Sequence, residues 1–291
     1  MKHKHIALAI LVTAIWGLNF SVIKIGLKSV DPFILAGVRF SLVALPAVLF
    51  IQRPYVPWRF LVAYGLVFGV GLWGIVNLGI QAGVSAGIAS LVLQFSAFFT
   101  IFLGSWVFKE KITKYQIVGI VVALAGLSSI IFITDGSVTL VGVALVILGA
   151  IFWSAANVIV KKSGTKEMLG FLVWSSLFAP LPLFALAFGL NGVHGYQALL
   201  AQINPSAVFS ILFQAYPTTI FGYWVWNSLM KKYPVSTVAP LSLLVPIFGI
   251  LGSVILFGEV VSSAKVFAVV LIVTGLAIGL YGKQIAQKLR R

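Results

Sequence analysis

The sequence predicts an all-α polytopic membrane protein whose ten transmembrane helices form two inverted five-helix repeats. Three observations support this fold class: ten apolar stretches of spanning length, positive charge concentrated in alternate gaps between them, and motifs that recur between the two halves. Of the 291 residues, 61% are hydrophobic and 9% are charged. No soluble fold covers so much apolar surface, so we expect the lipid bilayer to surround the chain over its whole length.

Each apolar stretch is long enough for one helix across the hydrocarbon core, which takes about 20 residues. The first stretch begins like a signal peptide, but it is too long and carries Trp16 and Asn19 where a cleavage site needs small residues, so we expect an uncleaved span. In chain order, the expected spans are Ile6–Ile23, Phe33–Ile51, Trp58–Ile80, Gly87–Phe108, Tyr115–Ile133, Leu140–Val160, Met168–Leu190, Ser206–Met230, Val235–Phe257 and Ala264–Tyr281.

Lysine and arginine are distributed unevenly over the gaps between these spans. One set of alternate gaps holds only Lys24, Lys28 and Lys265, and Arg39 lies within a span. Because short loops rich in Lys and Arg stay in the cytoplasm, we expect both termini there. The other gaps and the termini hold the remaining basic residues: Lys2, Lys4, Arg53, Arg59, Lys109, Lys111, Lys114, Lys161, Lys162, Lys166, Lys231, Lys232, Lys283, Lys288, Arg290 and Arg291.

Composition also excludes several function classes. The net charge of +15 follows from membrane topology and from attraction to anionic lipid, so no nucleic-acid partner is expected. The chain has no cysteine, no HExxH motif and no glycine-rich phosphate loop followed by lysine. We therefore expect no metal, no cofactor and no catalytic residue, and we do not expect an enzyme.

Motifs in the first half of the chain recur in the second half. Such recurrence indicates two repeats, 1–134 and 138–291, joined near residues 134–137. The matches are Trp16, Asn19 and Lys24 with Trp153, Asn157 and Lys162, at an offset of 137 or 138, and Glu110, Gly126 and Leu127 with Glu259, Gly275 and Leu276, at an offset of 149.

Five spans are an odd number, so the second repeat enters the membrane from the opposite side. Inverted repeats are typical of secondary transporters, which hold substrate near the midplane and alternate access to the two sides. A duplication kept only for packing, as in some channels, is the alternative.

Polar and aromatic side chains recur at helical spacing inside several spans. Polar groups at membrane depth are costly and are candidates for function, although each amide can also serve as a bond between helices. We expect them to line a cavity of amides and aromatic walls, suited to a small zwitterionic or amphipathic solute. The candidate substrate-binding residues are Trp16, Asn19, Phe20, Arg39, Trp73, Asn77, Gln94, Phe98, Trp153, Asn157, Tyr223 and Asn227.

The charged candidates are few. Arg39 lies about 10 Å into the second span at 1.5 Å per residue, and it needs a partner: a substrate carboxylate, Glu259 or backbone carbonyls. The repeat-related Glu110 and Glu259 are candidates for coupling or gating, and ion pairs with Lys109, Lys111 or Lys265 are the simpler interpretation. All five carboxylates fall at span ends or in loops, so an evident proton relay is missing.

Four motifs resemble the EamA type of the drug/metabolite transporter superfamily. They are Trp16-Gly-Leu-Asn19-Phe20, Ala36-Gly-Val-Arg39-Phe40, Ala89-Ser-Leu-Val-Leu-Gln94 and Ala239-Pro-Leu-Ser-Leu-Leu-Val-Pro246. The resemblance spans both repeats and implies ten helices, a central cavity, alternating access and efflux across the bacterial inner membrane. It favours Asn19, Arg39, Gln94 and Asn157 as site residues, and it implies export of small amino-acid-like metabolites of the cysteine and O-acetylserine type.

Other functions remain open on the sequence alone. A drug or nucleotide-sugar carrier of the same superfamily is the alternative within transport, and it would accept bulkier solutes. A passive pore or facilitator, or a membrane scaffold, is the alternative outside it. The sequence identifies neither the coupling ion nor the oligomeric state.

Overall fold

The computed structural model describes residues 1–130, 132, 136–197 and 204–289, and within these ranges the chain is helical and contains no strand. The α-helices are α1 (His3–Gly26), α2 (Pro32–Ala44), α3 (Trp58–Tyr64), α4 (Ile75–Gln81), α5 (Ala86–Val92), α6 (Ser96–Phe108), α7 (Lys114–Ile130), α8 (Leu140–Ser163), α9 (Met168–Ser176), α10 (Pro180–Asn191), α12 (Pro205–Phe213), α13 (Gly222–Lys232), α14 (Val235–Val238), α15 (Leu244–Phe257) and α16 (Ser263–Leu289). Tight 3₁₀ turns form η1 (Ala47–Leu49), η3 (Leu93–Phe95) and η5 (Ala239–Leu243), and wide π turns form η2 (Gly65–Gly74) and η4 (Gln214–Phe221).

Several of these elements continue one another as long apolar helices. In the part of the chain that the structure describes, eight helices are long and apolar enough to cross a membrane, so the chain is a polytopic membrane protein. They are His3–Gly26, Pro32–Leu49, Trp58–Gln81, Ala86–Phe108, Leu140–Ser163, Met168–Asn191, Ala239–Phe257 and Ser263–Gly282.

The other two expected spans are also helical. In the fifth, α7 has 17 described residues, and Ile133 at its expected end lies outside the described residues. The eighth corresponds to α12, η4 and α13 over 205–232, which is more polar and contains Pro217. Of the expected junction and C-terminus, Thr134, Asp135, Arg290 and Arg291 also lie outside the described residues.

Side-chain caps start four of the helices where the sequence places Asp, Ser, Thr or Asn before an apolar run. The carboxylate of Asp31 accepts from two backbone N–H groups at the start of α2, and Ser85, Thr139 and Asn204 each accept one at the starts of α5, α8 and α12. These bonds satisfy donors that a helix start leaves without an intrahelical acceptor. They fix where each helix enters the bundle.

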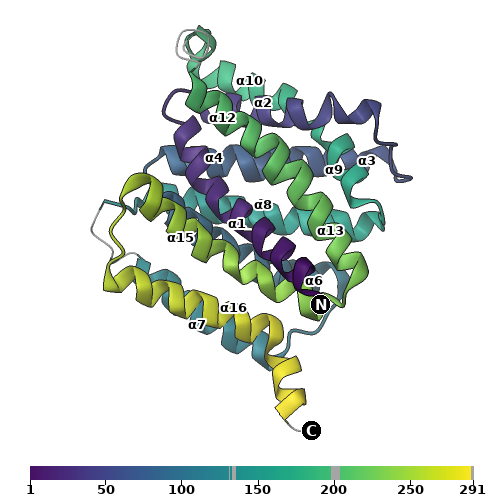
Figure 1. Cartoon of the computed structure of the whole chain (residues 1–291), viewed down its shortest axis with the longest axis vertical. Helices are drawn as coiled ribbons and strands as arrows, with labels where there is room; N and C mark the ends of the chain where they lie inside the picture. The colour runs from purple at the N-terminus through teal and green to yellow at the C-terminus, as the bar shows by residue number, and fades with distance from the viewer. Residues whose placement is uncertain (131, 133–135, 198–203, 290–291) are drawn as a thin grey trace.

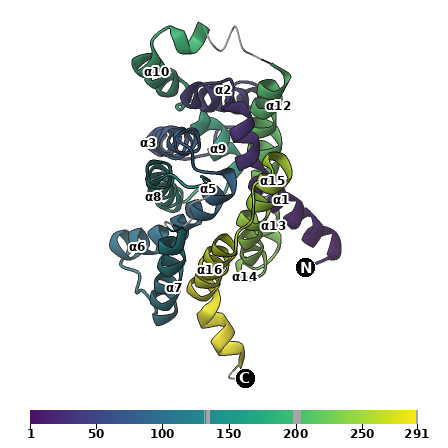
Figure 2. The ribbon, with the colours of Figure 1, turned by 90° about the vertical axis from the view of Figure 1, so that its left-hand side faces the viewer.

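The helices form one bundle that runs from the α2–α10 pair at one edge to the α7–α16 pair at the other (Figures 1 and 2). Between them, α1 packs along α15, and α8 packs against η2, α4 and α6. α1 begins and α16 ends toward the same side of the bundle (Figure 1). We call the end of the bundle that holds Lys24 and Glu259 the Lys24 end, and the opposite one, with Glu110 and Lys161, the Lys161 end.

Glycines allow the closest helix contacts. A Cβ on Gly17 of α1 would lie 2.5 Å from the carbonyl oxygen of Val245, so α1 and this part of α15 touch backbone to backbone. A Cβ on Gly119 of α7 would likewise lie 2.5 Å from backbone atoms of Gly275 and Gly279, so α7 and α16 also touch backbone to backbone. Small residues at such spacing are typical of tight helix pairs in membranes, where van der Waals contact stabilises association.

Gly119 provides a test of this packing. In Gly119→Ala, the new Cβ would meet the Gly275 carbonyl oxygen and the Gly279 nitrogen at 2.5 Å each, and backbone atoms cannot move aside cheaply. We expect the substitution to lower the free energy of unfolding by about 1–3 kcal/mol, measured by denaturation in detergent. Gly189→Ala on α10 is the control, since nothing lies within 4 Å of its added Cβ, and an equal loss in both variants would contradict the packing argument.

Candidate binding cavity

A cavity of about 370 Å³ lies at the centre of the bundle and is lined from both halves of the chain. Its volume falls in the range of small-molecule sites. The lining residues are Trp16, Asn19, Phe20, Arg39, Tyr64, Trp73, Ser90, Leu93, Gln94, Ser96, Ala97, Trp153, Asn157, Val160, Met168, Thr218, Tyr223, Trp226, Asn227, Ala239, Ser242 and Val245.

Arg39 is the only basic residue among those lining residues, and it is completely buried. Its Nε and Nη2 donate to Thr219 Oγ1 at 3.2 and 2.9 Å, and the hydroxyl of Thr219 donates in turn to the Gln214 carbonyl at 2.7 Å. The guanidinium also lies 4.3 Å from the ring of Trp73 and 5.3 Å from that of Phe40. Within the described residues it has no carboxylate partner, so its charge is stabilised by one hydroxyl and by aromatic faces.

The wide turn of η4 places Thr219 for this role. Pro217 lacks an N–H group and interrupts the regular ladder, and the chain adopts π turns over Gln214–Phe221. π turns are frequent at functional sites because they redirect side chains. The same segment presents Thr218, whose hydroxyl donates to Asn19 Oδ1 at 3.1 Å and whose carbonyl accepts from Trp16 Nε1 at 3.0 Å.

Four buried polar atoms in the cavity wall have no hydrogen-bond partner within the described residues. They are Asn19 Nδ2, Arg39 Nη1, Trp73 Nε1 and Asn227 Nδ2, and all four are N–H donors. An unsatisfied buried donor costs about 1–3 kcal/mol. Because none of the described lining residues is acidic, the wall offers unpaired donors and a positive charge without a matching negative charge.

Aromatic rings form the rest of the wall. Trp16 lies 5.3 Å from Tyr223 and 5.2 Å from Trp226 between ring centroids, and Phe20 lies 6.2 Å from Trp73. These rings come from both halves of the chain. Their faces can contact apolar groups of a solute or a cation.

The cavity extends toward the Lys161 end. Asn19 and Arg39, deep in the bundle, are fully buried, whereas Asn157 is exposed. The lining continues to Val160, next to Lys161, and to Met168 at the start of α9. The site is therefore reached from the Lys161 end.

Ten of the twelve expected substrate-binding residues line this one cavity, and two do not. Asn77 is turned away: its amide donates to the Pro32 carbonyl at 3.1 Å. Phe98 packs against Phe95 and lies beside Gly279 of α16. Both residues were expected in the cavity because they continue a row of side chains at α-helical spacing. The row passes through the wide π turns of η2 or the tight 3₁₀ turn of η3, and there the helix face rotates.

The acidic candidates lie outside the cavity wall and have other partners than expected. Lys24 Nζ lies 3.1 Å from Glu259 Oε1, and Lys161 pairs with Glu110. Arg39 therefore does not pair with Glu259, and the expected pairs of the two glutamates with neighbouring lysines are not the ones formed. Each pair joins residues of different halves of the chain.

Sequence reasoning missed several lining residues. Tyr64, which stacks on Phe68, lines the cavity together with Thr218 and Ser242, and none of the three was expected there. Trp226 lines it as well. Trp226 follows Tyr223 at helical spacing and was recognisable in the polar face of α13. Thr218 was not recognisable, because it lies in the π turns of η4, where side chains depart from α-helical spacing.

A membrane-embedded helical bundle with a central cavity lined from both halves is typical of small-solute transporters. The model of the EamA-like transporter family matches residues 3–132 and 140–281, and the chain belongs to this family. A protein of Salmonella typhimurium strain LT2 named "Probable amino-acid metabolite efflux pump" is 38% identical over 100% of this chain and 99% of its own length. The Escherichia coli K12 protein of the same name is 38% identical over 97% and 96% of the two chains.

Two further comparisons extend this result. An uncharacterized inner membrane transporter of Escherichia coli K12, YedA, is 32% identical over 65% of this chain and 67% of its own. A crystal structure that covers 100% of both chains has a TM-score of 0.64 at 18% identity, which shows a shared fold. The chain is thus a member of a transporter family and not of an enzyme family.

Thr219 gives a test of the Arg39 site. Thr219→Val keeps the shape but removes the acceptor of two guanidinium N–H bonds. We expect the free energy of unfolding in detergent to fall by about 1–3 kcal/mol, the cost of leaving buried donors unpaired. Thr13→Val is the matched control: Thr13 is also fully buried, but it bonds only to the Ile10 carbonyl of its own helix. If both variants lost the same stability, Thr219 would have no special role at Arg39.

Proposed function

We propose that this protein exports small metabolites with a free carboxylate, of the amino-acid type, across the bacterial inner membrane by alternating access. The observation that carries the proposal is the buried guanidinium of Arg39, which has an unpaired N–H group and no carboxylate partner among the described residues. A cation at membrane depth without a carboxylate counter-ion among the described residues favours an anion supplied by the substrate.

The donors around Arg39 define the anionic pole of the substrate. Three N–H groups in the same wall have no hydrogen-bond acceptor among the described residues: Arg39 Nη1, Trp73 Nε1 and Asn19 Nδ2. A carboxylate has two oxygens with about four lone-pair sites and suits an arginine fork. We therefore place the carboxylate between Arg39 and these two N–H groups.

The rest of the cavity suits the remainder of such a metabolite. An ammonium group can lie against the faces of Trp16, Tyr223 and Trp226. Gln94 and Asn157 supply amide groups nearer the mouth. The names of the two relatives at 38% identity, as amino-acid metabolite efflux pumps, support this substrate class. Within it, the cysteine and O-acetylserine type remains our choice.

The ten-span inverted repeat is part of the proposal. The two family matches, over 3–132 and 140–281, support a division into repeats 1–134 and 138–291. A second support is local: η4 begins 149 positions after η2, the offset that separates Glu110 from Glu259. The third helix of each half thus contains the same rare turn.

The distribution of positive charge indicates which end of the bundle faces the cytoplasm. The Lys161 end carries most of the loop lysines and arginines, so it faces the cytoplasm together with both termini. The cavity is then open to the cytoplasm and shut on the outside, which is the state in which an exporter loads. The inner-membrane name of YedA supports the location.

Two alternatives remain: dependence on a carboxylate tests the first, and counterflow tests the second. A nucleotide-sugar or drug carrier would bind bulky solutes without needing a carboxylate. A passive facilitator that acts as a pore would carry the same solutes without saturation or counterflow. In proteoliposomes loaded with O-acetylserine, external O-acetylserine should accelerate release if the protein is a carrier, and unchanged release would favour the facilitator.

Arg39→Gln tests the substrate class. Removing the charge while keeping some hydrogen bonding should weaken binding of amino-acid metabolites roughly 10- to 100-fold, the range expected for hydrogen bonds to charged groups. Binding is measured in detergent by calorimetry. Methyl esters of the same metabolites should bind weakly to both proteins. Arg53→Gln is the control variant, since Arg53 lies in a loop and donates to the Val56 carbonyl. Equal binding of acid and ester by the native protein would overturn the proposed substrate.

Labelling of single thiols tests the orientation. The chain has no cysteine, so Tyr55→Cys and Val193→Cys each introduce the only thiol, at an exposed loop of the Lys161 end and of the Lys24 end respectively. In intact cells, an impermeant maleimide should label Val193→Cys alone, and both variants should react after permeabilisation. The reverse pattern would place the termini outside.

A further inference from the structure

The two cross-half ion pairs have the construction of a pair of gates. We propose that Lys24–Glu259 and Lys161–Glu110 are reciprocal latches, one at each end of the bundle: both pairs are formed in this structure, and each stabilises the shut form of its end when closure buries it. This inference rests on the proposed alternating access.

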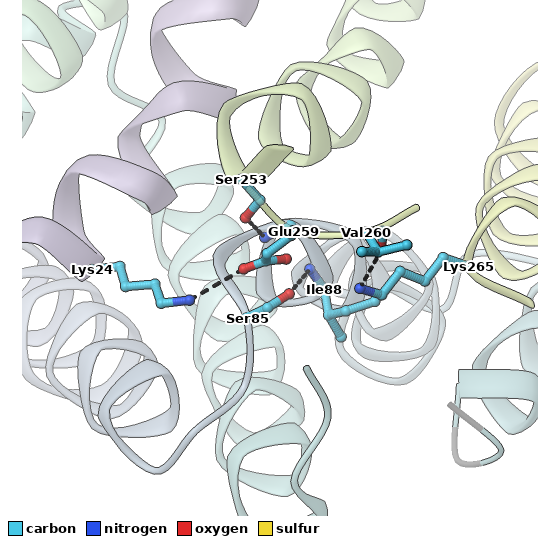
Figure 3. A network of polar contacts seen from close by, with 8 residues as sticks. Lys24, Ser85, Ile88, Ser253, Glu259, Val260 and Lys265 are labelled. Atoms are coloured by element: carbon cyan, nitrogen blue, oxygen red, sulfur yellow. Dashed lines mark hydrogen bonds and ion pairs between the residues drawn. The ribbon is translucent and has the colours of Figure 1, made fainter. Parts of the chain in front are cut away.

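The Lys24 latch joins α1 of the first half to the α15–α16 connection of the second half. Figure 3 shows Lys24 reaching Glu259, at 3.1 Å between Nζ and Oε1. The same ammonium lies 4.4 Å from the ring centre of Phe257. The latch therefore consists of Phe257 and Glu259 holding Lys24.

The neighbourhood of the Lys24 latch ties the same helices together. Ser253 Oγ, on α15, accepts from the Gly87 N–H at the start of α5 at 2.8 Å, and Lys265 Nζ donates to the Val260 carbonyl at 2.9 Å (Figure 3). Lys265 itself is buried. These bonds fix the connection that carries Glu259.

The Lys161 latch repeats this construction with the halves exchanged. Lys161, at the end of α8 in the second half, pairs with Glu110 of the first half, and its Nζ lies 4.4 Å from the ring centre of Phe108. Phe108 and Glu110 precede Phe257 and Glu259 by the same 149 positions. In both latches the phenylalanine and the glutamate of one half hold the lysine of the other.

The backbone between phenylalanine and glutamate is also the same. Lys109 has φ of 59° and Gly258 has φ of 63°, so each helix ends in a left-handed residue that turns the glutamate back. Lys109 is the only residue other than glycine with positive φ among the described residues. Such a conformation is disfavoured for a side chain with a Cβ and persists where the surrounding structure requires it.

The latch at the shut end of the cavity is more buried than the latch at the open end. At the shut Lys24 end, the side chains of Lys24 and Glu259 are 34% and 16% exposed, whereas at the open Lys161 end those of Lys161 and Glu110 are 53% and 52% exposed. An exposed ion pair contributes little because water and salt screen it, and a partly buried one is screened less. The Lys24 latch therefore holds the present state, and rocking the halves would bury the other latch in its place.

Thiol accessibility measures which end is shut. Ser21→Cys places a thiol at a fully buried position of α1 between the cavity and the Lys24 latch, close to Gly252. An impermeant maleimide added from the Lys24 end reacts with it when that end opens. Glu259→Gln should raise the labelling rate roughly threefold or more, since it removes the charge that holds the end shut.

Weakening the Lys161 latch should change the labelling rate of Ser21→Cys in the opposite direction. Glu110→Gln weakens the state that is shut at the Lys161 end, so labelling of Ser21→Cys should fall below that of the native pair. The exchange Lys24→Glu with Glu259→Lys should restore the native rate. Lys162→Gln is the matched control, because this exposed lysine has no ion pair within the described residues, and it should leave the rate unchanged.

The outcomes separate this inference from the proposed function. If Glu259→Gln and Glu110→Gln changed labelling in the same direction, or not at all in properly inserted protein, the latches would be overturned. Neither result depends on the identity of the solute. If labelling followed the latches while acid and ester metabolites bound equally, the substrate class would fail and the gates would stand.

Discussion

The structure depends on one buried charge that the protein does not neutralise. Arg39 lies at membrane depth with two N–H groups on the hydroxyl of Thr219 and its guanidinium against the ring of Trp73. Burying a cation without a counter-ion is costly, and such residues within membrane spans are candidates for function. Three further N–H donors face the same cavity, and no described acidic residue lines it. We propose that a substrate carboxylate accepts from these donors.

The bundle around this charge combines rigid and adjustable parts. Glycine contacts between α1 and α15 and between α7 and α16 bring backbones together and leave no room for movement within each pair. The π turns of η2 and η4, by contrast, lie on the helices that cross the cavity wall and depart from the regular hydrogen-bond ladder. Rigid pairs joined by helices with irregular turns are the parts that a rocking mechanism requires.

Much of this organisation could be predicted from the sequence, because bilayer thickness and the cost of buried polar groups act on every residue in the same way. Asn19 and Arg39 were recognisable as polar side chains at membrane depth, and both line the cavity. Asn77 and Phe98 were misplaced because a π turn or a 3₁₀ turn precedes each and rotates the helix face. The partner of Glu259 could not be predicted either: nearby lysines are favoured by sequence distance, whereas Lys24 is brought to it by the packing of α1 on α15.

The most direct measurement is an experimental structure of the protein with a bound amino-acid metabolite, at a resolution that places its carboxylate. Our interpretation requires a carboxylate oxygen within hydrogen-bond distance of Arg39 Nη1, in a solvated cavity that opens to one side of the membrane. A solute bound with its carboxylate far from Arg39, or a dry centre in which the buried amides bond only to one another, would contradict it.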